Sequence, residues 1–158
     1  MMKRTETIRI FYEKNKQALY TYALSLTRNR ESAEDAVHTV ICKLLKRPIL
    51  PVGMRPYAFR CVRNAAIDDW RSHGAKKEAL FDLEAITMSA EERALWRQID
   101  DLLYELTGDE RETIILKAAH EFTFQEIATL RRVSIHTVAS WYRRGIQKLQ
   151  SMIAEKTK

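Results

Sequence analysis

Apolar residues along most of the chain recur every three or four positions, the spacing that gathers side chains on one face of an α-helix. Residues 6–27 follow this spacing, and the stretch between Asn29 and Pro48 repeats it. All three prolines lie between residues 48 and 56, together with Gly53, which predicts a loop between two helices. Because the sequence lacks alternating β-branched runs joined by hairpin turns, we expect an all-α fold.

Capping residues mark where the expected helices begin. Asn29 is a candidate N-cap, followed by acidic residues in the first turns, where the helix dipole favours carboxylates. Pro56 is expected to open a third helix that runs to about His73, since the first turn needs no N–H from it. Ser134 is a candidate cap for the last helix. Three capping boxes precede further apolar runs, namely Ser89-x-x-Glu92, Thr107-x-x-Glu110 and Thr123-x-x-Glu126.

One stretch, residues 72–92, lacks a sustained helical period. It contains a glycine and mixed charges, which favours a linker with one short helical piece. We therefore predict two small helical domains, residues 1–74 and residues 91–158, joined by a linker over residues 75–90.

Residues 123–150 have the layout of a helix-turn-helix, with a short capped helix, a turn at residues 131–133 and a longer capped helix. Ala128 is small enough for the close crossing of the two helices that this motif requires. The apolar residues expected around it are Ile127, Val133, Ile135 and Val138. An ordinary pair of antiparallel helices is the plainer alternative.

The last helix has two distinct faces. Its apolar face carries Ile135, Val138, Tyr142, Ile146, Leu149 and Ile153. Its opposite face carries His136, Thr137, Ser140, Arg143, Arg144 and Gln147. This second face has no carboxylate, and its donors suit phosphates and base edges in a major groove. A solvated surface without a ligand is the alternative for such a face.

The third helix presents a comparable polar face beside the proline-rich loop. Arg60, Arg63, Asn64 and Arg71 fall within roughly a third of its circumference. The nearby aromatic residues are Tyr57, Phe59 and Trp70. Core packing is the expected place for Phe59 and Trp70, whereas Tyr57 is equally suited to stacking on unpaired bases.

The distribution of charge separates the chain into three parts. The 158 residues carry a net charge of +6, which divides into +7 over residues 1–75, −6 over residues 76–122 and +5 over residues 123–158. Two basic blocks around an acidic middle favour two surfaces that meet a polyanion, with solvated helix faces as the alternative. No run approaches the roughly 18 apolar residues of a spanning helix, and no signal peptide is evident, so we expect a cytoplasmic protein.

The sequence offers little for catalysis or metal binding. Cys42 and Cys61 form no CxxC pair and have no histidine cluster nearby, so neither a disulfide framework nor a zinc site is indicated. His38 and Cys42 are four residues apart on one helix face, as a base and a nucleophile or two metal ligands would be, but no third partner has a recognisable spacing. We therefore expect a protein without cofactors, metal or small-molecule substrate that is not an enzyme.

Three blocks in order, AEDAVHTVICKLL at 33–45, RPYAFRCVRNAAIDDWR at 55–71 and residues 106–149, carry a family resemblance. They resemble the two conserved domains of extracytoplasmic-function sigma factors, the small members of the sigma-70 family. Members bind bacterial RNA polymerase core, recognise the −35 promoter element with the C-terminal helix-turn-helix, and open and read the −10 element with the N-terminal domain. The resemblance implies that the chain directs core polymerase to promoter DNA, with an anti-sigma factor as a further candidate partner.

Residue by residue, the resemblance implies three sets of contacts. The polymerase β′ clamp would meet Glu34, Asp35 and His38. The −10 element would meet Arg60, Arg63, Asn64 and Arg71, with Asn64 holding a base and the loop at 48–56 receiving it. The −35 element would meet His136, Thr137, Ser140, Arg143 and Arg144.

The chain departs from the family pattern at several positions. Thr39 stands where the family often has glutamate, Arg132 where it has a glycine in the turn, and Ala139 and Trp141 where it has basic residues. A left-handed Arg132 would cost roughly 1–2 kcal/mol. Two other functions fit parts of the sequence: a stand-alone helix-turn-helix regulator, which would dimerise on a palindrome, and a sigma-like interaction module that does not touch DNA.

Overall fold

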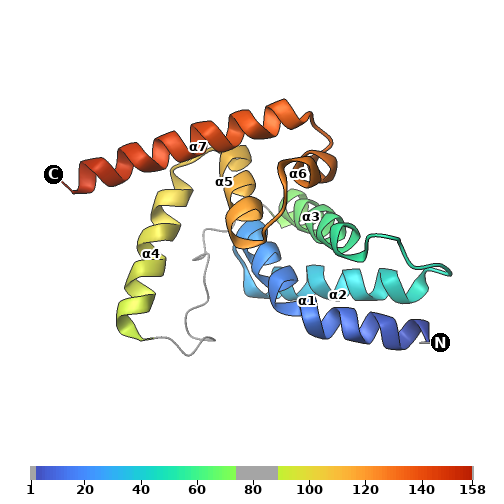
Figure 1. The fold of residues 1–158 in the computed structure, drawn as a ribbon. Helices are drawn as coiled ribbons and strands as arrows, with labels where there is room; N and C mark the ends of the chain where they lie inside the picture. The colour runs from blue at the N-terminus through green and yellow to red at the C-terminus, as the bar shows by residue number, and fades with distance from the viewer. Residues whose placement is uncertain (1–2, 74–88, 158) are drawn as a thin grey trace. The chain divides into compact units, whose positions relative to one another are not determined.

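A computed structural model describes residues 3–73 and 89–157 (Figure 1). The helices are α1 (Arg4–Thr27), α2 (Arg30–Lys46), α3 (Met54–His73), α4 (Ala90–Tyr104), α5 (Gly108–Ile114), the π-helix η1 (Ile115–Ala119), α6 (Phe124–Arg131) and α7 (Ile135–Lys156). The described residues contain no strand, which confirms the all-α prediction. The chain divides into two compact units, Met1–Leu80 and Phe81–Lys158. Most of the expected linker, including its short helical piece, lies outside the described residues.

The first unit is a three-helix bundle in which α1, α2 and α3 all pack against one another (Figure 1). Its fully buried side chains include Leu19, Tyr22, Val40, Leu44, Phe59 and Val62. The rings of Tyr22 on α1 and Phe59 on α3 lie 5.0 Å apart, so the prediction that Phe59 belongs to the core is confirmed. Burying a side chain of this size contributes about 1.5–3 kcal/mol.

The ends of these helices follow from local chemistry. Asn29 caps α2 as predicted, because its side chain accepts a hydrogen bond from the Ser32 N–H at 2.9 Å. Helix α3 begins at Met54, two residues earlier than expected, and Pro56 lies inside its first turn. A proline is tolerated there because first-turn N–H groups have no partner within the helix.

Every predicted cap in the second unit is formed. Ser89, Thr107 and Thr123 each accept a hydrogen bond from a backbone N–H three residues on, and the glutamate at that position bonds back to the capping residue. Ser134 accepts a hydrogen bond from the Thr137 N–H at 3.1 Å. Each such cap stabilises its helix by about 1 kcal/mol, so the four helix starts are specified locally.

Helix α7 crosses α5 at close range, and Gly145 is the residue at the crossing. A Cβ atom on Gly145 would lie 2.6 Å from Ile114 Cδ1 and 3.4 Å from Glu110 Cβ. Only a residue without a side chain therefore allows the two helices to approach this closely.

Some residues predicted to be buried are exposed in the second unit. Ile135 and Ile153 are 40% and 49% exposed. Ile135 is the first residue of α7, at the rim of the helix-turn-helix, and Figure 1 shows α4 extending away from α7. Helical spacing identifies an apolar stripe but not how far a neighbouring helix covers it.

Candidate nucleic-acid interface

The turn between α6 and α7 has the geometry of a helix-turn-helix. It covers residues 132–134, one residue later than predicted. Arg132 is left-handed, with φ 56° and ψ 46°, as its position in place of a glycine implied. The next residue closes the turn, since the Val133 N–H donates to the Ala128 carbonyl at 3.0 Å. Packing around the turn therefore supports the strained Arg132 backbone.

The crossing of α6 and α7 buries Ala128, Ile127 and Val138, whereas Val133, also expected there, is partly buried and Ile135 is exposed. Ala128 is 2% exposed, and Ile127 and Val138 are fully buried, as predicted. The rings of Phe124 on α6 and Tyr142 on α7 lie 5.2 Å apart and add an aromatic contact. These contacts fix the crossing and turn the opposite face of α7 outward.

The five residues predicted to meet the −35 element lie on that outward face. His136, Arg143 and Arg144 are exposed, while Thr137 and Ser140 are partly buried. The Arg143 guanidinium donates to Ser140 Oγ, and Arg144 Nε donates to the Ser140 carbonyl, both at 3.4 Å. Because no acidic residue occurs between Ser134 and Ser151, the face is positively charged.

A cluster around Arg131 was not foreseen from the sequence. Its Nη1 lies 2.9 Å from Glu112 Oε2 and its Nη2 donates to Asp109 Oδ1 at 2.5 Å. The guanidinium carbon also lies 4.9 Å from the centre of the Trp141 ring. Arg131 is therefore a structural cation that joins α5, α6 and α7, and its side chain is only 10% exposed. Trp141, which stands where the family has a basic residue, could have indicated this cluster from the sequence, because an aromatic ring packs favourably against a cation.

A second ion pair joins α5 and α7. Lys148 Nζ lies 2.8 Å from Glu110 Oε1, and Glu110 also accepts the Thr107 N–H as part of its capping box. Burial opposes ionisation of Glu110, but the hydrogen bonds from Lys148 and Thr107 outweigh it and hold the pKa of this carboxyl below its usual 4.5.

The lowered pKa of Glu110 gives the second unit a pH-dependent stability. The ionised carboxylate stabilises the fold fully above the unfolded pKa, and this contribution is lost as the pH falls through the lower folded pKa. In Lys148→Met we expect burial to raise the pKa of Glu110, so that acid destabilisation begins at higher pH. Urea unfolding between about pH 6 and pH 3 measures the shift. Lys156→Met, in the exposed last turn of α7, is the matched control and should leave the pH profile unchanged.

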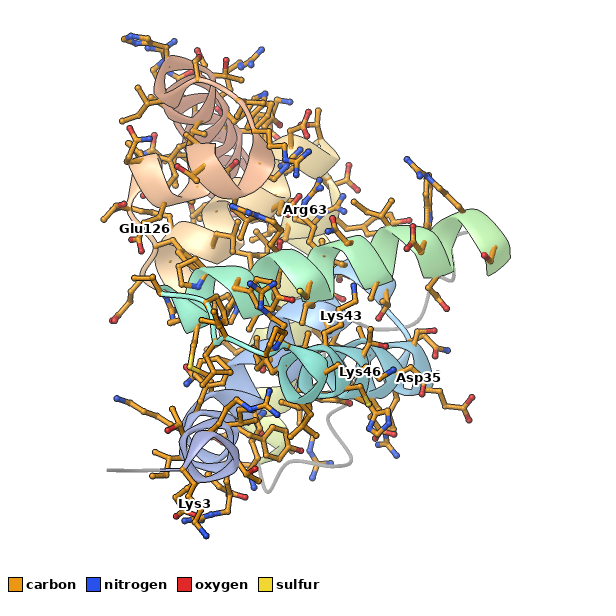
Figure 2. The ribbon with its side chains drawn as sticks, turned by 90° about the vertical axis from the view of Figure 1, so that its right-hand side faces the viewer. Lys3, Asp35, Lys43, Lys46, Arg63 and Glu126 are labelled. Carbon is orange, nitrogen blue, oxygen red and sulfur yellow. The ribbon has the colours of Figure 1, made fainter. Side chains whose placement is uncertain are left out.

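Helix α3 carries the predicted −10 residues in the first unit. Arg60 and Arg63 are partly buried, and Asn64 and Arg71 are exposed. Their spacing places them opposite the buried Ala58, Val62 and Ala66. Figure 2 shows Arg63 directed away from α2.

The prediction that Trp70 belongs to the core is wrong, because its side chain is 55% exposed. It lies near the C-terminal end of α3, one turn beyond Ala66. Ala66 is the last described residue of α3 whose apolar side chain is buried. The position along the helix, rather than the aromatic residue type, decides its exposure. An exposed tryptophan therefore shares α3 with the four polar candidates.

The loop before α3 exposes apolar residues beside a half-buried aromatic ring. Ile49 is 77% exposed and Val52 is fully exposed. The Arg47 guanidinium lies 5.0 Å from the centre of the Tyr57 ring, and its Nε donates to the Ile49 carbonyl at 3.2 Å. Exposed apolar and aromatic groups of this kind are suited to contacts with bases.

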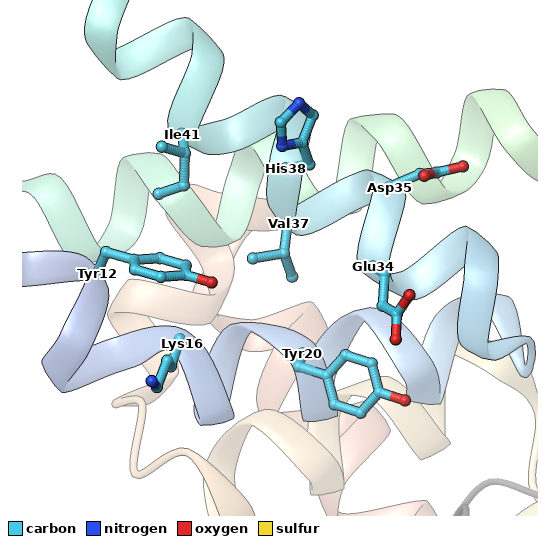
Figure 3. Close-up of a pocket in the computed structure, with 8 residues that line it drawn as sticks. All are labelled: Tyr12, Lys16, Tyr20, Glu34, Asp35, Val37, His38 and Ile41. Carbon is cyan, nitrogen blue, oxygen red and sulfur yellow. The ribbon is translucent and has the colours of Figure 1, made fainter. Parts of the chain in front are cut away.

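The predicted clamp contacts Glu34, Asp35 and His38 are exposed on α2. They border a pocket of 520 Å³ between α1 and α2 (Figure 3). The residues that line this α1–α2 pocket are Tyr12, Lys16, Tyr20, Glu34, Asp35, Val37, His38 and Ile41. The α1 side of the pocket was not found from the sequence, because its residues follow the same apolar spacing as the core.

The two cysteines differ in burial and are both free. Cys61 is buried, whereas Cys42 is only partly buried and its Sγ lies 3.5 Å from His38 Nε2. Residues 3–73 and 89–157 contain no cluster of three metal-binding side chains. Among the same residues, no helix is long and apolar enough to cross a membrane.

Family models decide which kind of protein carries these surfaces. The Sigma-70 region 2 model matches residues 11–76, and the Sigma-70, region 4 model matches residues 96–149. The chain belongs to the sigma-70 family. The two matches hold the α3 face and the α7 face respectively, and they confirm the resemblance to extracytoplasmic-function sigma factors. The chain is thus an RNA polymerase sigma factor, and sigma factors are transcription initiation factors.

Individual relatives agree with this family. The sigma factor is 27% identical over 139 residues to the RNA polymerase sigma factor CarQ of Myxococcus xanthus. The matched region covers 82% of this chain and 79% of CarQ. Its fold is similar to that of the sigma factor RpoE in complex with the anti-sigma factor NepR from Bartonella quintana, with a TM-score of 0.70 and 22% identity over 92% of this chain and 98% of that one. CnrH in complex with the cytosolic domain of CnrY gives a TM-score of 0.67 and 20% identity over 94% of this chain and 88% of that one.

Proposed function

We propose that this sigma factor divides promoter recognition between its two units. Residues 1–74 bind the polymerase core and the −10 element, residues 91–158 bind the −35 element, and residues 75–90 connect them. The observation that carries the proposal is the outward face of α7, on which three exposed basic or imidazole side chains surround Ser140 without any carboxylate.

In this proposal, some of the −35 contacts position the protein on the DNA backbone, and the others read the base sequence. Arg143 and Arg144 bind phosphates, because their guanidinium groups are exposed and face the same side as Ser140. His136, Thr137 and Ser140 lie nearer the start of α7, where a recognition helix meets base edges. Trp141 is held against Arg131 and contributes to the placement of α7 rather than to base reading.

The test of this role is Arg144→Ala in the full-length protein. Loss of one charged DNA contact is expected to weaken binding to a promoter duplex about tenfold, equivalent to about 1.4 kcal/mol. Fluorescence anisotropy with labelled promoter DNA, selected from a pool by transcription with core polymerase, measures the affinity.

Arg97→Ala is the matched control for charge, because Arg97 is exposed on α4, away from the α7 face. Equal affinity of Arg144→Ala and the wild type would contradict the proposed −35 face and favour an interaction module that does not bind DNA. A wild-type protein that binds a palindrome but no polymerase core would favour the stand-alone regulator.

Helix α3 reads the −10 element in this proposal. Asn64 is exposed and offers an amide that hydrogen-bonds a base, while Arg60, Arg63 and Arg71 bind the backbone. Flipping a base costs a few kcal/mol, which stacking and hydrogen bonds must offset. The loop at 48–56, next to the partly buried Tyr57, provides such a surface.

The exposed carboxylates of Glu34 and Asp35, with His38, form the proposed contact with the polymerase β′ clamp. The solved relatives RpoE and CnrH are complexes with NepR and the cytosolic domain of CnrY. We extend this property to the present chain and propose that an anti-sigma factor also binds it. Because polymerase and promoters reside in the cytoplasm, we place the protein there.

A further inference from the structure

We propose that Arg132, in the turn between α6 and α7, binds a backbone phosphate at the edge of the −35 element. The proposal rests on the proposed function, in which the outward face of α7 binds that element. It adds a residue outside α7 to the contact and specifies the chemical group that this residue binds. Two features of Arg132 carry it, namely a strained backbone and a side chain that the described fold does not use.

The backbone of Arg132 ends α6 in a conformation that suits glycine. Its φ of 56° and ψ of 46° lie in the left-handed region, and its N–H is directed to the carbonyls of Ala128 and Thr129. This conformation closes the last turn of α6 and starts the connection to α7. Glycine adopts it without strain, whereas a residue with a Cβ atom is strained there. The backbone therefore does not require an arginine, and the side chain needs a reason of its own.

The Arg132 side chain has no partner within the described fold. It is exposed, and no residue within 3–73 or 89–157 gives its guanidinium a hydrogen bond, an ion pair or a ring contact. The preceding residue is the opposite case, because Arg131 is only 10% exposed and is held by Glu112 and Asp109. The free protein thus bears the strain at Arg132 without a compensating side-chain contact. Strained residues of this kind are typical of binding sites, where the partner supplies the contact.

Two other described residues share a left-handed backbone, but neither suits a phosphate at this site. Arg28 belongs to the first unit and is partly buried. Glu121 is exposed but carries a negative charge, which repels a phosphate. Among the described residues other than glycine, only Arg132 combines a left-handed backbone, an exposed side chain and a positive charge.

The position of Arg132 places it at the start of the proposed −35 face. Residues 132–134 form the turn that leads into α7 (Figure 1), and Ser134 caps that helix. In a helix-turn-helix, the start of the second helix lies in the major groove, between two phosphate backbones. A residue just before that start lies at the rim of the groove rather than over the base edges. The phosphate backbone is therefore the part of the DNA nearest to Arg132.

The charges around the turn favour an anion as the partner. No acidic residue occurs between Ser134 and Ser151. Glu126 lies at the opposite end of α6, where its carboxylate accepts the Thr123 N–H at 2.9 Å. A guanidinium can form two parallel hydrogen bonds with a phosphate, and such a contact does not depend on the base sequence. Arg132 is therefore expected to strengthen binding to any duplex and to leave the choice between sequences to α7.

The test compares two variants of Arg132 with the wild type in the full-length protein. Arg132→Gly removes the guanidinium and relieves the strain, whereas Arg132→Gln removes the charge and keeps the strained backbone. Both are expected to weaken binding to a labelled promoter duplex about fivefold, measured by the same fluorescence anisotropy as Arg144→Ala. Arg132→Lys keeps the charge and should lose less affinity. Arg97→Gln, exposed on α4, removes one charge elsewhere and should retain wild-type affinity.

Salt dependence and sequence dependence identify the group that Arg132 binds. Loss of one phosphate contact should reduce the slope of log affinity against log salt concentration by about 0.9 in both variants. The affinity for an unrelated duplex of the same length should fall by the same factor as that for the promoter duplex, because every duplex presents phosphates. An unchanged slope, or a loss confined to the promoter duplex, would overturn the phosphate contact.

The stability of the variants shows whether the side chain serves the fold instead. Urea unfolding should find Arg132→Gly at least as stable as the wild type, because glycine fits the left-handed backbone. Weaker DNA binding with undiminished stability supports the contact. A clear loss of stability in both variants would show that Arg132 supports the second unit in the free protein and would overturn the proposal. Weaker binding of Arg132→Gly alone would also overturn it, since a more flexible turn, rather than the lost charge, would be the cause.

The variant Arg144→Ala separates failure of this inference from failure of the proposed function. If Arg144→Ala weakens promoter binding while both Arg132 variants bind like the wild type, the α7 face stands and only the Arg132 contact is overturned. If Arg144→Ala and both Arg132 variants all bind like the wild type, the proposed −35 face itself is overturned.

Discussion

Replacement of Arg131 by methionine is expected to destabilise the second unit by about 3–5 kcal/mol. The guanidinium lies 2.9 Å from the Glu112 carboxylate, which is only 7% exposed, so the substitution takes a nearby cation away from a buried charge. Asp109 is 49% exposed and adds little to the loss. Methionine keeps the packing against Trp141, so the substitution removes the charge of Arg131 with little loss of side-chain volume. Urea unfolding followed by circular dichroism should show the second unit unfolding at lower urea, with the first unit unaffected.

A double variant identifies the cause of this loss. Arg131→Met combined with Glu112→Met removes both buried charges and should recover most of the stability. If the double variant were as unstable as the single one, the buried carboxylate would not be the cause. Arg132→Gly is the neighbouring control, since glycine adopts the left-handed backbone of this residue without strain, and it should not lower stability.

Replacement of Trp70 by alanine is expected to reduce promoter opening about tenfold. Stacking of one base on an aromatic side chain contributes about 1–3 kcal/mol, and 1.4 kcal/mol corresponds to tenfold. The side chain is 55% exposed on the helix that carries Asn64 and Arg71, so its ring is accessible to unpaired bases. The fluorescence of 2-aminopurine placed in the −10 element measures opening when core polymerase and the sigma factor are added.

The remaining variants show whether stacking or folding accounts for the effect. Trp70→Phe should retain part of the opening activity, because a smaller ring still stacks. The thermal stability of Trp70→Ala should match that of the wild type, since little apolar area is lost from the core. Wild-type opening together with reduced stability would show that Trp70 supports the fold of α3 instead.

The sequence predicts the helix starts better than it predicts burial. The caps at Asn29, Thr107 and Ser134 depend on residues within three positions, so their chemistry is visible in the chain itself. The left-handed Arg132 was indicated only by the family resemblance, in which a glycine stands at this position. Trp70 was misplaced because its exposure depends on where the other two helices of the bundle end.

The candidate site was predictable only in part, for a similar reason. Helical spacing places Ser140, Arg143 and Arg144 together, because they lie within two turns of one helix. The Arg131 cluster was missed, since its partners include Asp109, 22 residues away on another helix. The α1–α2 pocket was missed as well, because two helices must pack before Tyr20 and Glu34 become neighbours.

Gly145 makes α7 behave mechanically as a lever with its pivot on α5. The residue lies 11 positions after Ser134, so about 16 Å of helix separate the pivot from the start of the proposed DNA-binding face. A tilt of about 5° at the pivot would displace that segment by more than about 1 Å. Binding sites need to be held to within about 0.5 Å, so we expect the tight contact at Gly145 to set the precision with which the proposed −35 face aligns on a promoter.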